Sequence, residues 1–414
     1  MSETNYYFRD TCRMCGKLSL KKAMSLTPTP PGNDFLTKEE LGINETKYPL
    51  DLYFCKNCFH IQLGHVVDPK ILYQKNYTYV SATSENFVTH LEKYAYKMIK
   101  RFNLQPETLV IDIGSNDGTT LSFFKKEGMR VLGVDPAKDI ALKATNEGIH
   151  TIGEFFSYSM ACQLKSMFGS CKYITSHNAC AHIDNLLDVV KGVEHLLDDD
   201  GVFVIEVGYF VDVYQNTWFD TIYHEHVDYH TIAPFEKLFS RVNMEIIDVE
   251  RIDPQGGSIR VMAQKKGGKH KRLSSVDELI ALEHELGLNK YNTLKEFEKK
   301  INDVRQKLQE LVHSLKQDGK TIAGYGAPTK ATTLMSHFGL NEKVLDFIVD
   351  DNPLKQGLFT PITHIPVLST ETLYERKPDY VMILAWNFAK PIMKMQERYR
   401  RDIGKFIIPM PIPK

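Results

Sequence analysis

The middle of the chain alternates between short apolar runs and stretches with helical spacing. Residues 85–102 place apolar side chains three and four positions apart, which predicts an amphipathic helix. Four apolar runs follow, with stretches of helical character between them: residues 109–113, 130–134, 172–175 and 201–207. Buried strands that alternate with helices form parallel sheets. The pattern predicts an α/β unit, and residues 245–250 with 258–264 predict an antiparallel hairpin that closes its sheet.

The C-terminal third repeats this alternation after a long helix. Apolar side chains from Leu294 to Leu315 share one face of the predicted helix, and Thr293 with Glu296 forms a capping box at its start. Gly319 is expected just past its end. The strands predicted after it are residues 321–325, 345–349 and 380–384. We therefore expect a second, Rossmann-like α/β domain.

The first 75 residues follow a different pattern, with Pro and Gly among the apolar positions and little helical period. We expect short strands and loops in this part of the chain. A length of 414 residues allows two or three domains, each with its own core. We place the domains at residues 1–75, 76–270 and 271–414.

Composition and charge narrow the functional classes. The chain is 43% hydrophobic and 25% charged, and its net charge of −1 gives no support for a nucleic-acid or membrane-surface partner. No apolar run approaches the roughly 20 residues of a membrane span. The N-terminus lacks the charged and apolar regions of a signal peptide. We expect a cytoplasmic globular protein, and no obligate protein partner is evident.

Four of the seven cysteines form two CxxC pairs, Cys12 with Cys15 and Cys55 with Cys58. Each CxxC turn presents both sulfurs to one point, and four thiolates complete the tetrahedral shell of Zn²⁺. The metal would be structural, because no ligand position is left open. The alternatives are a redox CxxC motif and four ordinary buried thiols.

The loop after the first predicted strand has the sequence DIGSNDG and precedes a helix. Its small residues let the backbone approach a cofactor, and such a loop is typical of S-adenosylmethionine enzymes. About 20 residues on, Asp135 ends the next strand, where a carboxylate accepts hydrogen bonds from ribose hydroxyls. The loop does not match GxGxxG, which disfavours a nicotinamide cofactor; an ordinary strand–turn–helix is the alternative. The expected cofactor-binding residues are Asp112, Gly114, Ser115, Asn116, Asp117, Asp135, Pro136, Glu154, Phe155 and Asn178.

Acid–base side chains cluster after two later strands. His182 follows the fourth strand, and residues 223–226, with the sequence YHEH, follow the fifth. Ligands bind at the C-terminal ends of parallel strands in open α/β sheets. Imidazole and phenol groups beside a methyl donor suggest that a proton is removed before the methyl is accepted, which favours methylation at carbon. The alternatives are a metal site that adds His230, and a polar surface loop.

A glycine-containing loop, residues 324–330, follows the first strand of the C-terminal domain. Its backbone N–H groups and Lys330 could hold a diphosphate, although its glycine spacing is too short for a dinucleotide fingerprint. Residues 350–353 end the next strand, where ribose or base contacts would fall. The expected nucleotide-binding residues are Tyr325, Ala327, Lys330, Asp351 and Asn352.

Together these segments resemble the nucleotide-sugar C-methyltransferases, the group that includes the tetronitrose C-methyltransferases of antibiotic biosynthesis. The resemblance covers essentially the whole chain and rests on the motifs CxxCG, CxxC, DIGSNDG, NxxAH, FDTIYHEH, GGSIR, GYGAxxK and DDNPxKxG. It implies a class I S-adenosylmethionine-dependent methyltransferase core between a zinc-binding domain and a nucleotide-sugar-binding domain. The substrate it implies is a nucleoside-diphosphate 4-keto-deoxysugar, methylated at C-3.

The resemblance also implies that His226 is the base and that Tyr223 stabilises the oxyanion. A sugar C–H beside a ketone can be removed to give an enolate, whereas an isolated one is far too weak an acid for imidazole. The alternatives are O- or N-methylation of a nucleotide sugar and a non-catalytic zinc protein that binds one. The candidate catalytic residues are His226, Tyr223, Glu225, His182, Tyr77, Tyr79 and His224.

Overall fold

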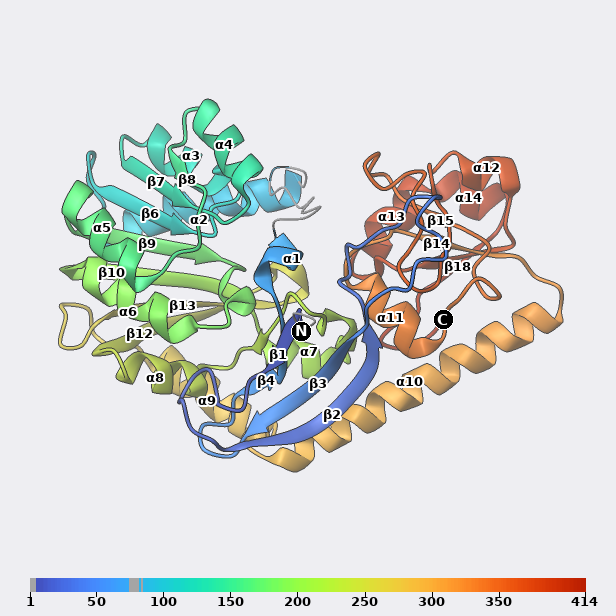
Figure 1. Ribbon diagram of the computed structural model, residues 1–414, viewed down its shortest axis with the longest axis horizontal. Helices are drawn as coiled ribbons and strands as arrows, with labels where there is room; N and C mark the ends of the chain where they lie inside the picture. The colour runs from blue at the N-terminus through green and yellow to red at the C-terminus, as the bar shows by residue number, and fades with distance from the viewer. Residues whose placement is uncertain (1–4, 74–81, 83–84) are drawn as a thin grey trace.

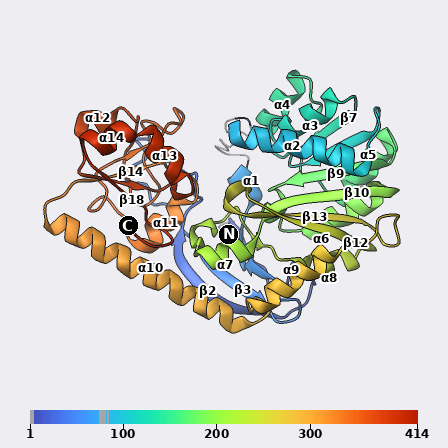
Figure 2. The ribbon, with the colours of Figure 1, turned by 180° about the vertical axis from the view of Figure 1, so that it is seen from behind.

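The computed structural model describes residues 5–73, 82 and 85–414, whose strands form four sheets. Two of these sheets form separate lobes (Figure 1). The long helix α10 (Tyr291–Gln317) runs from one lobe towards the other, beside the N-terminal strands β2 (Leu20–Thr29) and β3 (Tyr48–Cys55). Figure 2 shows the same arrangement from behind. Among the described residues, no helix is long and apolar enough to cross a membrane.

The larger lobe is built on a seven-stranded sheet in the order β12-β13-β10-β9-β6-β7-β8. Six strands run in one direction, and β13 runs antiparallel to both of its neighbours, β10 and β12. The predicted closing hairpin is therefore confirmed, and the sheet is that of a class I methyltransferase. The strands are β6 (Leu109–Ile113), β7 (Arg130–Val134), β8 (Thr151–Ile152), β9 (Cys171–His177), β10 (Leu197–Gly208), β12 (Met244–Ile252) and β13 (Ser258–Lys265).

Helices cover both faces of this sheet, because alternate side chains of each strand point to opposite sides. Val110 packs in the core that includes α2 and α3, whereas Ile111 and Ile113 pack in the core that includes α5 and α6. The helix predicted over residues 85–102 is confirmed as α2. The helices of this lobe are α2 (Glu85–Phe102), α3 (Thr119–Lys126), α4 (Lys138–Asn146), α5 (Tyr158–Phe168), α6 (Leu186–Leu196), α7 (Phe210–Asn216) and α8 (Ile232–Ser240).

The smaller lobe has a fully parallel five-stranded sheet in the order β16-β15-β14-β17-β18, which confirms a second Rossmann-like unit. The sequence pattern missed β16 and β18, since both are short. The strands are β14 (Ile322–Tyr325), β15 (Ile348–Val349), β16 (Val367–Leu368), β17 (Tyr380–Ile383) and β18 (Lys405–Ile407). The helices are α11 (Ala331–Phe338), α12 (Thr372–Arg376), α13 (Ala389–Met395) and α14 (Glu397–Asp402).

The N-terminal strands connect the two lobes. β2 and β3 are longer than the short strands expected, and they pair with each other. β3 also pairs with β4 (Ile61–Leu63), which pairs in turn with β11 (Asp228–Tyr229). The chain between the two cysteine pairs also reaches the smaller lobe, where Leu36 forms an antiparallel bridge with Phe359. The three-domain division stays a proposal, because β11 belongs to the N-terminal sheet. The other elements here are β1 (Tyr6–Phe8), β5 (His65–Val67) and α1 (Pro69–Tyr73).

The start of α10 differs from the prediction. The helix begins at Tyr291, and the Thr293 hydroxyl donates to the carbonyl of Gly287 at 2.6 Å, so it does not cap the helix. The capping-box prediction was wrong, because this bond to the preceding turn takes the hydroxyl. An unpredicted helix, α9 (Ser274–Glu285), precedes that turn. The C-terminal end is confirmed: Gly319, with φ +70°, lies two residues past the last helical residue.

Candidate active site

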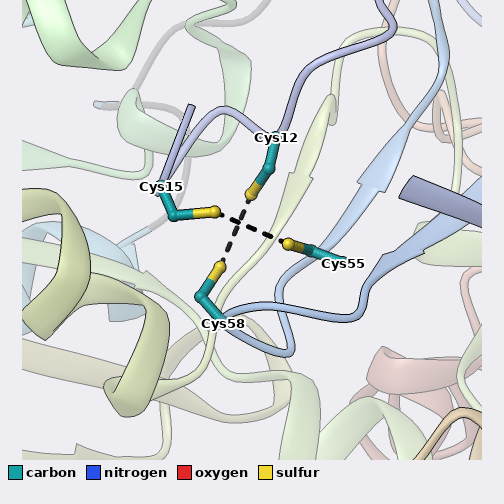
Figure 3. A group of neighbouring side chains, drawn as sticks. All are labelled: Cys12, Cys15, Cys55 and Cys58. Carbon is teal, nitrogen blue, oxygen red and sulfur yellow. Dashed lines mark hydrogen bonds between the residues drawn. The ribbon is translucent and has the colours of Figure 1, made fainter. Parts of the chain in front are cut away.

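The four predicted zinc ligands converge (Figure 3). The sulfurs of Cys12 and Cys58 are 3.5 Å apart, those of Cys15 and Cys55 are 3.6 Å apart, and all four lie within 4.8 Å of one another. Tetrahedral zinc with Zn–S bonds of about 2.3 Å separates its sulfurs by about 3.8 Å. The thiols therefore fit a Zn²⁺ ion. Within the described part of the chain, no other His, Cys, Asp or Glu group has metal-site geometry, which disfavours the histidine metal site.

A cavity of about 740 Å³ opens at the C-terminal ends of β6, β7, β9 and β10. It is lined by both lobes and by the N-terminal part of the chain. All the expected cofactor-binding residues except Asp117 and Glu154 line it. It also contains His182, Tyr223, Glu225, His226 and Lys330.

The loop after β6 lines one end of the cavity. It is closely packed, and polar side-chain atoms near it have no hydrogen-bond partner in the described part of the chain. Gly114 has φ +76°, and a Cβ there would lie 2.4 Å from the Cβ of Ala179, so only glycine fits. Asp112 Oδ1, Ser115 Oγ and both ring nitrogens of His177 are buried with no hydrogen-bond partner among the described residues. Buried polar groups are normally paired, so these atoms fit a polar ligand such as the methionine moiety of S-adenosylmethionine.

The Asp135 carboxylate lies at the end of β7 and shapes the same loop. One oxygen accepts the backbone N–H of Asn116 at 2.8 Å, and the other accepts that of Ala137 at 2.8 Å. Each carboxylate oxygen has a second lone pair that can accept a ribose hydroxyl. Burial raises the pKa of Asp135, and the two N–H groups oppose this shift.

Two of the expected cofactor residues point elsewhere. One oxygen of Asp117 accepts the backbone N–H of Thr119 at 3.1 Å and its hydroxyl at 2.6 Å, which fixes the start of α3. Glu154 is exposed, with a carboxylate oxygen 4.0 Å from the Lys138 ammonium. Phe155, by contrast, lines the cavity with 41% of its surface exposed.

The His226 ring is held as a neutral imidazole with a fixed tautomer. Its Nδ1 lies 2.9 Å from the carbonyl oxygen of Thr221, and since a carbonyl only accepts, Nδ1 carries the hydrogen. The lone pair is therefore on Nε2, which lies 2.9 Å from the Tyr223 hydroxyl. Burial lowers the pKa of His226 to about 4, so the ring is neutral near pH 7.

His182 stands beside His226, with ring centroids 4.9 Å apart and planes at 86°. A backbone bond fixes this approach, because the N–H of Val227 donates to the carbonyl of Ala181 at 2.8 Å. The Tyr73 hydroxyl lies 3.0 Å from His182 Nδ1 and 3.2 Å from the carbonyl oxygen of Glu225. Burial, followed by the neighbouring His226, lowers the pKa of His182 well below its usual range.

Glu225 joins the larger lobe to the smaller one. Its Oε1 accepts a hydrogen bond from the Asn33 amide at 3.2 Å, and the Thr329 hydroxyl donates to the Asn33 side-chain oxygen at 2.8 Å. Burial raises the pKa of Glu225 to about 7, although Asn33 and the charge of Lys355 oppose the shift. A carboxyl with this pKa is protonated in a large fraction of molecules near neutral pH.

Three candidate catalytic residues are not placed in the cavity. His224 is buried beside it, with Nε2 2.9 Å from the carbonyl oxygen of Thr29 and its ring edge against Tyr48. This bond between β2 and the loop suggests that His224 has a structural role. Tyr77 and Tyr79 lie outside the described residues.

Of the expected nucleotide-binding residues that the structure describes, Lys330 lines the cavity. Its ammonium lies 3.9 Å from the ring centroid of Trp386 and 3.9 Å from Asp220 Oδ2. The other four, Tyr325, Ala327, Asp351 and Asn352, do not line the cavity; Tyr325 ends β14, and the other three lie in the loops after β14 and β15. The Tyr325 hydroxyl donates to Asp351 at 3.0 Å, and the backbone N–H groups of Ala327 and Asn352 both donate to Asp350.

Comparison with known proteins assigns each part of the chain. Residues 253–411 match the family model of a C-methyltransferase C-terminal domain, residues 12–73 match a zinc binding domain, and residues 87–249 match a methyltransferase domain. The C-methyltransferase NovU of Streptomyces niveus is 35% identical over 405 residues, which cover 98% of this chain and 96% of NovU. The chain belongs to this C-methyltransferase family.

This C-methyltransferase uses S-adenosylmethionine and has a cysteine cluster for zinc. The chain is similar to an S-adenosylmethionine-dependent methyltransferase from Clostridium acetobutylicum, with 14% identity, 45% of this chain and 94% of that chain covered, and a TM-score of 0.36. A second similar structure is the magnesium protoporphyrin IX methyltransferase ChlM from Synechocystis. Its identity is 12%, the coverage is 43% of this chain and 79% of that chain, and the TM-score is 0.33.

Tyr73, Asn33 and Lys355 are among the cavity residues of this C-methyltransferase that sequence reasoning missed. Lys355 lies in the DDNPxKxG motif, so a signal for it was present. Its ammonium donates to the carbonyl of Ala327 at 2.7 Å, and burial lowers its pKa. Asn33 and Tyr73 had no local signal, because their partners are more than 100 residues away in the sequence.

Proposed function

We propose that this C-methyltransferase methylates C-3 of a nucleoside-diphosphate 4-keto-deoxysugar, the carbon next to the ketone, after His226 removes a proton from it. The observation that carries the proposal is the hydrogen bonding of His226. Thr221 fixes the hydrogen on Nδ1, and the basic Nε2 lies in the same cavity as the cofactor loop, against the Tyr223 hydroxyl. A neutral base beside a phenol suits removal of a proton next to a carbonyl.

Tyr223 and His226 have different roles in the proposed reaction. In the resting enzyme Tyr223 donates its hydrogen to Nε2 of His226, because Nε2 can only accept. When the ketone oxygen of the substrate takes that hydrogen bond, the Nε2 lone pair is released and can accept the C-3 proton. The Tyr223 hydroxyl then stabilises the enolate oxygen. General base catalysis contributes roughly 10²–10⁴ in rate, and one aimed oxyanion donor contributes about 10²–10³.

Two neighbouring groups support the developing charge. His182 is neutral and stands edge-on to the His226 ring, so no second positive charge opposes protonation of His226. Glu225 lines the same cavity and carries a proton in many molecules near pH 7, so it can donate a second hydrogen bond to the ketone oxygen. S-adenosylmethionine, when bound, supplies an electrophilic methyl group to the nucleophilic carbon.

Two lysines of the smaller lobe favour a diphosphate in the substrate. Lys330 and Lys355 both line the cavity, and burial lowers the pKa of each ammonium. The Asp220 carboxylate is 3.9 Å from Lys330, which is too far for a close hydrogen bond. A buried ammonium is stable only with a compensating anion, and two of them match the two phosphates of a nucleoside diphosphate.

A matched pair of nucleotide sugars tests the proposal. The enzyme is incubated with S-adenosylmethionine and either a nucleoside-diphosphate 4-keto-6-deoxysugar or the same compound reduced to the 4-hydroxyl. We expect methyl transfer to the ketone alone, because the hydroxyl compound has no acidic C–H. Transfer to both compounds would indicate O-methylation and would contradict enolisation. Absence of transfer to every 4-ketosugar in a panel of nucleobases and C-3 substituents would contradict the substrate class.

The nucleotide is tested separately with sugars that keep the ketone but lack the nucleoside diphosphate. We expect the free 4-ketosugar to be methylated only at much higher concentration, since the contacts with Lys330 and Lys355 are lost. Equal rates with and without the nucleotide would remove the proposed role of the smaller lobe and leave the role of His226 intact.

A further inference from the structure

The Arg13 guanidinium is buried between the zinc site and the two segments that carry His182 and His226. Arg13 lies between the ligands Cys12 and Cys15 and is 1% exposed. Its backbone N–H donates to the side-chain oxygen of Gln62 at 2.9 Å. The two cysteines and Gln62 therefore fix the backbone of Arg13, and the direction of its side chain is set by the metal site.

The guanidinium holds the segment that carries His182. Its Nε donates to Asp184 Oδ1 at 2.9 Å, and NH2 lies 2.9 Å from the same oxygen. Asp184 follows His182 by two residues. The Arg9 guanidinium also donates to Asp184, at 2.7 Å, but from the solvent side.

The same guanidinium holds the segment that carries His226. Its NH1 donates to the carbonyl of Leu63 at 2.8 Å and to that of Val227 at 3.3 Å, and it lies 3.9 Å from Asp228 Oδ1. Val227 directly follows His226. His60, just past the second cysteine pair, lies 2.6 Å from Asp228 Oδ1. Both cysteine pairs of the zinc site are thus connected to the residues next to the base.

We propose that Arg13 is a positioning residue, which joins the zinc site to both active-site histidines and sets the approach of the His182 and His226 segments. The inference rests on the proposed function, in which these histidines act on the substrate. One planar cation with five N–H donors reaches the carboxylate on one segment and the carbonyl on the other. Lysine keeps the charge but presents a single point, so it cannot hold both segments at once.

This connection explains why a structural metal site belongs next to the catalytic loop. Zinc would fix the four cysteines and with them the backbone of Arg13. The Arg13 side chain then holds the two segments that the hydrogen bond from Val227 to Ala181 joins. Catalytic groups must be positioned accurately relative to the reacting atoms, and a displacement of about 1 Å can lower the rate roughly 10²-fold. Arg13 thus acts on the His182 and His226 segments through contacts with residues 171 and 214 positions away in the sequence.

Arg13→Lys tests the inference in the full-length zinc-loaded enzyme. We expect kcat to fall by roughly 10²-fold, while the KM for the nucleotide sugar, the affinity for S-adenosylmethionine and the zinc content stay at the wild-type values. Amide hydrogen exchange should become faster in peptides that cover residues 180–184 and 223–228 and stay unchanged in α3. An unchanged kcat, or an equal rise in exchange throughout the protein, would overturn the positioning role.

Arg241→Lys is the matched control, because Arg241 contacts the same zinc loop from the other side. Its guanidinium donates to the carbonyl of Met14 at 2.8 Å, and within the described part of the chain it forms no hydrogen bond or ion pair with residues 180–184 or 223–228. We expect wild-type kcat for this variant. An equal loss in both variants would mean that damage to the zinc loop, and not the Arg13 contacts, lowers the rate.

Asp184→Asn provides a second variant in case Arg13→Lys does not fold. Asp184 is less buried, with 15% of its side chain exposed, and asparagine keeps its shape while weakening its bonds to the guanidinium. We expect a smaller fall in kcat with the same pattern of exchange. If His226→Asn inactivates the enzyme but neither Arg13→Lys nor Asp184→Asn changes kcat, the inference fails and the proposed function stands. If His226→Asn also has no effect, the proposed function fails first.

Discussion

The Tyr223 hydroxyl lies 2.9 Å from Nε2 of His226, and the other ring nitrogen of His226 lies 2.9 Å from the Thr221 carbonyl. The backbone therefore selects the tautomer, and the phenol covers the basic nitrogen. A substrate with a ketone can draw the phenol hydrogen away, whereas an alcohol competes for it less well. In this arrangement the group that makes the C–H acidic also releases the base that removes the proton.

Replacing His226 by Asn tests the base. Asparagine is polar and of similar size, but it cannot take up a proton near neutral pH. We expect turnover to fall by roughly 10²–10⁴, with S-adenosylmethionine affinity unchanged by calorimetry. Exchange of the C-3 hydrogen with solvent deuterium should fall in parallel. His150→Asn, at an exposed position in the same lobe, is the control. Near wild-type turnover of His226→Asn would move the base to another residue.

Replacing Tyr223 by Phe tests the oxyanion donor. The ring still packs against His226, whose centroid is 4.1 Å away, but the donor is lost. We expect kcat to fall by about 10²–10³ with little change in KM, because the lost hydrogen bond strengthens only as the enolate forms. A change confined to KM would show that Tyr223 binds the substrate without stabilising the transition state.

The pH dependence of kcat/KM should show the ionisation of Glu225. Its pKa is raised to about 7 by burial, so the proton is present below pH 7 and is lost above it. If the protonated carboxyl donates to the ketone, kcat/KM falls as the pH rises through 7. On the acid side, the lowered pKa of His226, about 4, keeps the base neutral well below pH 6.5.

Glu225→Gln is the matched variant for this prediction, since its amide keeps a hydrogen-bond donor at every pH. We expect the fall above pH 7 to disappear in a kcat/KM profile of the variant. The same fall in wild type and variant would assign it to another group.

Replacing Lys330 or Lys355 by Gln tests the diphosphate site. A charge-assisted hydrogen bond is worth about 1.5–3 kcal/mol, so KM for the nucleotide sugar should rise roughly 10- to 100-fold in either variant. The affinity for S-adenosylmethionine should be unchanged. Lys390→Gln, at an exposed position on α13, serves as the control. If both variants keep the wild-type KM, the diphosphate lies elsewhere in the cavity.

The sequence predicted those parts of the site that depend on strand order. Asp112 lies near the end of β6, Asp135 follows β7 and His182 comes after β9. These three parallel strands are neighbours in the sheet and their ends meet at one edge, so the convergence of the side chains could be expected. The zinc site was predictable for a similar reason, because each CxxC turn fixes two ligands locally.

The remaining features depend on contacts between distant segments. Local motif position suggested a nucleotide role for Tyr325 and Asp351, but it could not show that their side chains bond to each other and do not line the cavity. His224 belongs to the same short motif as His226, but its ring reaches β2. No sequence motif indicated a role for Arg13, because its partners Asp184 and Val227 are 171 and 214 residues away and contact it only in the folded protein.

The position of the transferred methyl group in the product tests methylation next to the ketone directly. The enzyme is incubated with a nucleoside-diphosphate 4-keto-deoxysugar and S-adenosylmethionine labelled with ¹³C in the methyl group, and the product is studied by two-dimensional NMR. We expect a methyl carbon bonded to C-3, with methyl protons that correlate through three bonds with the C-4 carbonyl carbon. A methyl group on oxygen or nitrogen, or on a carbon not adjacent to the ketone, would contradict it.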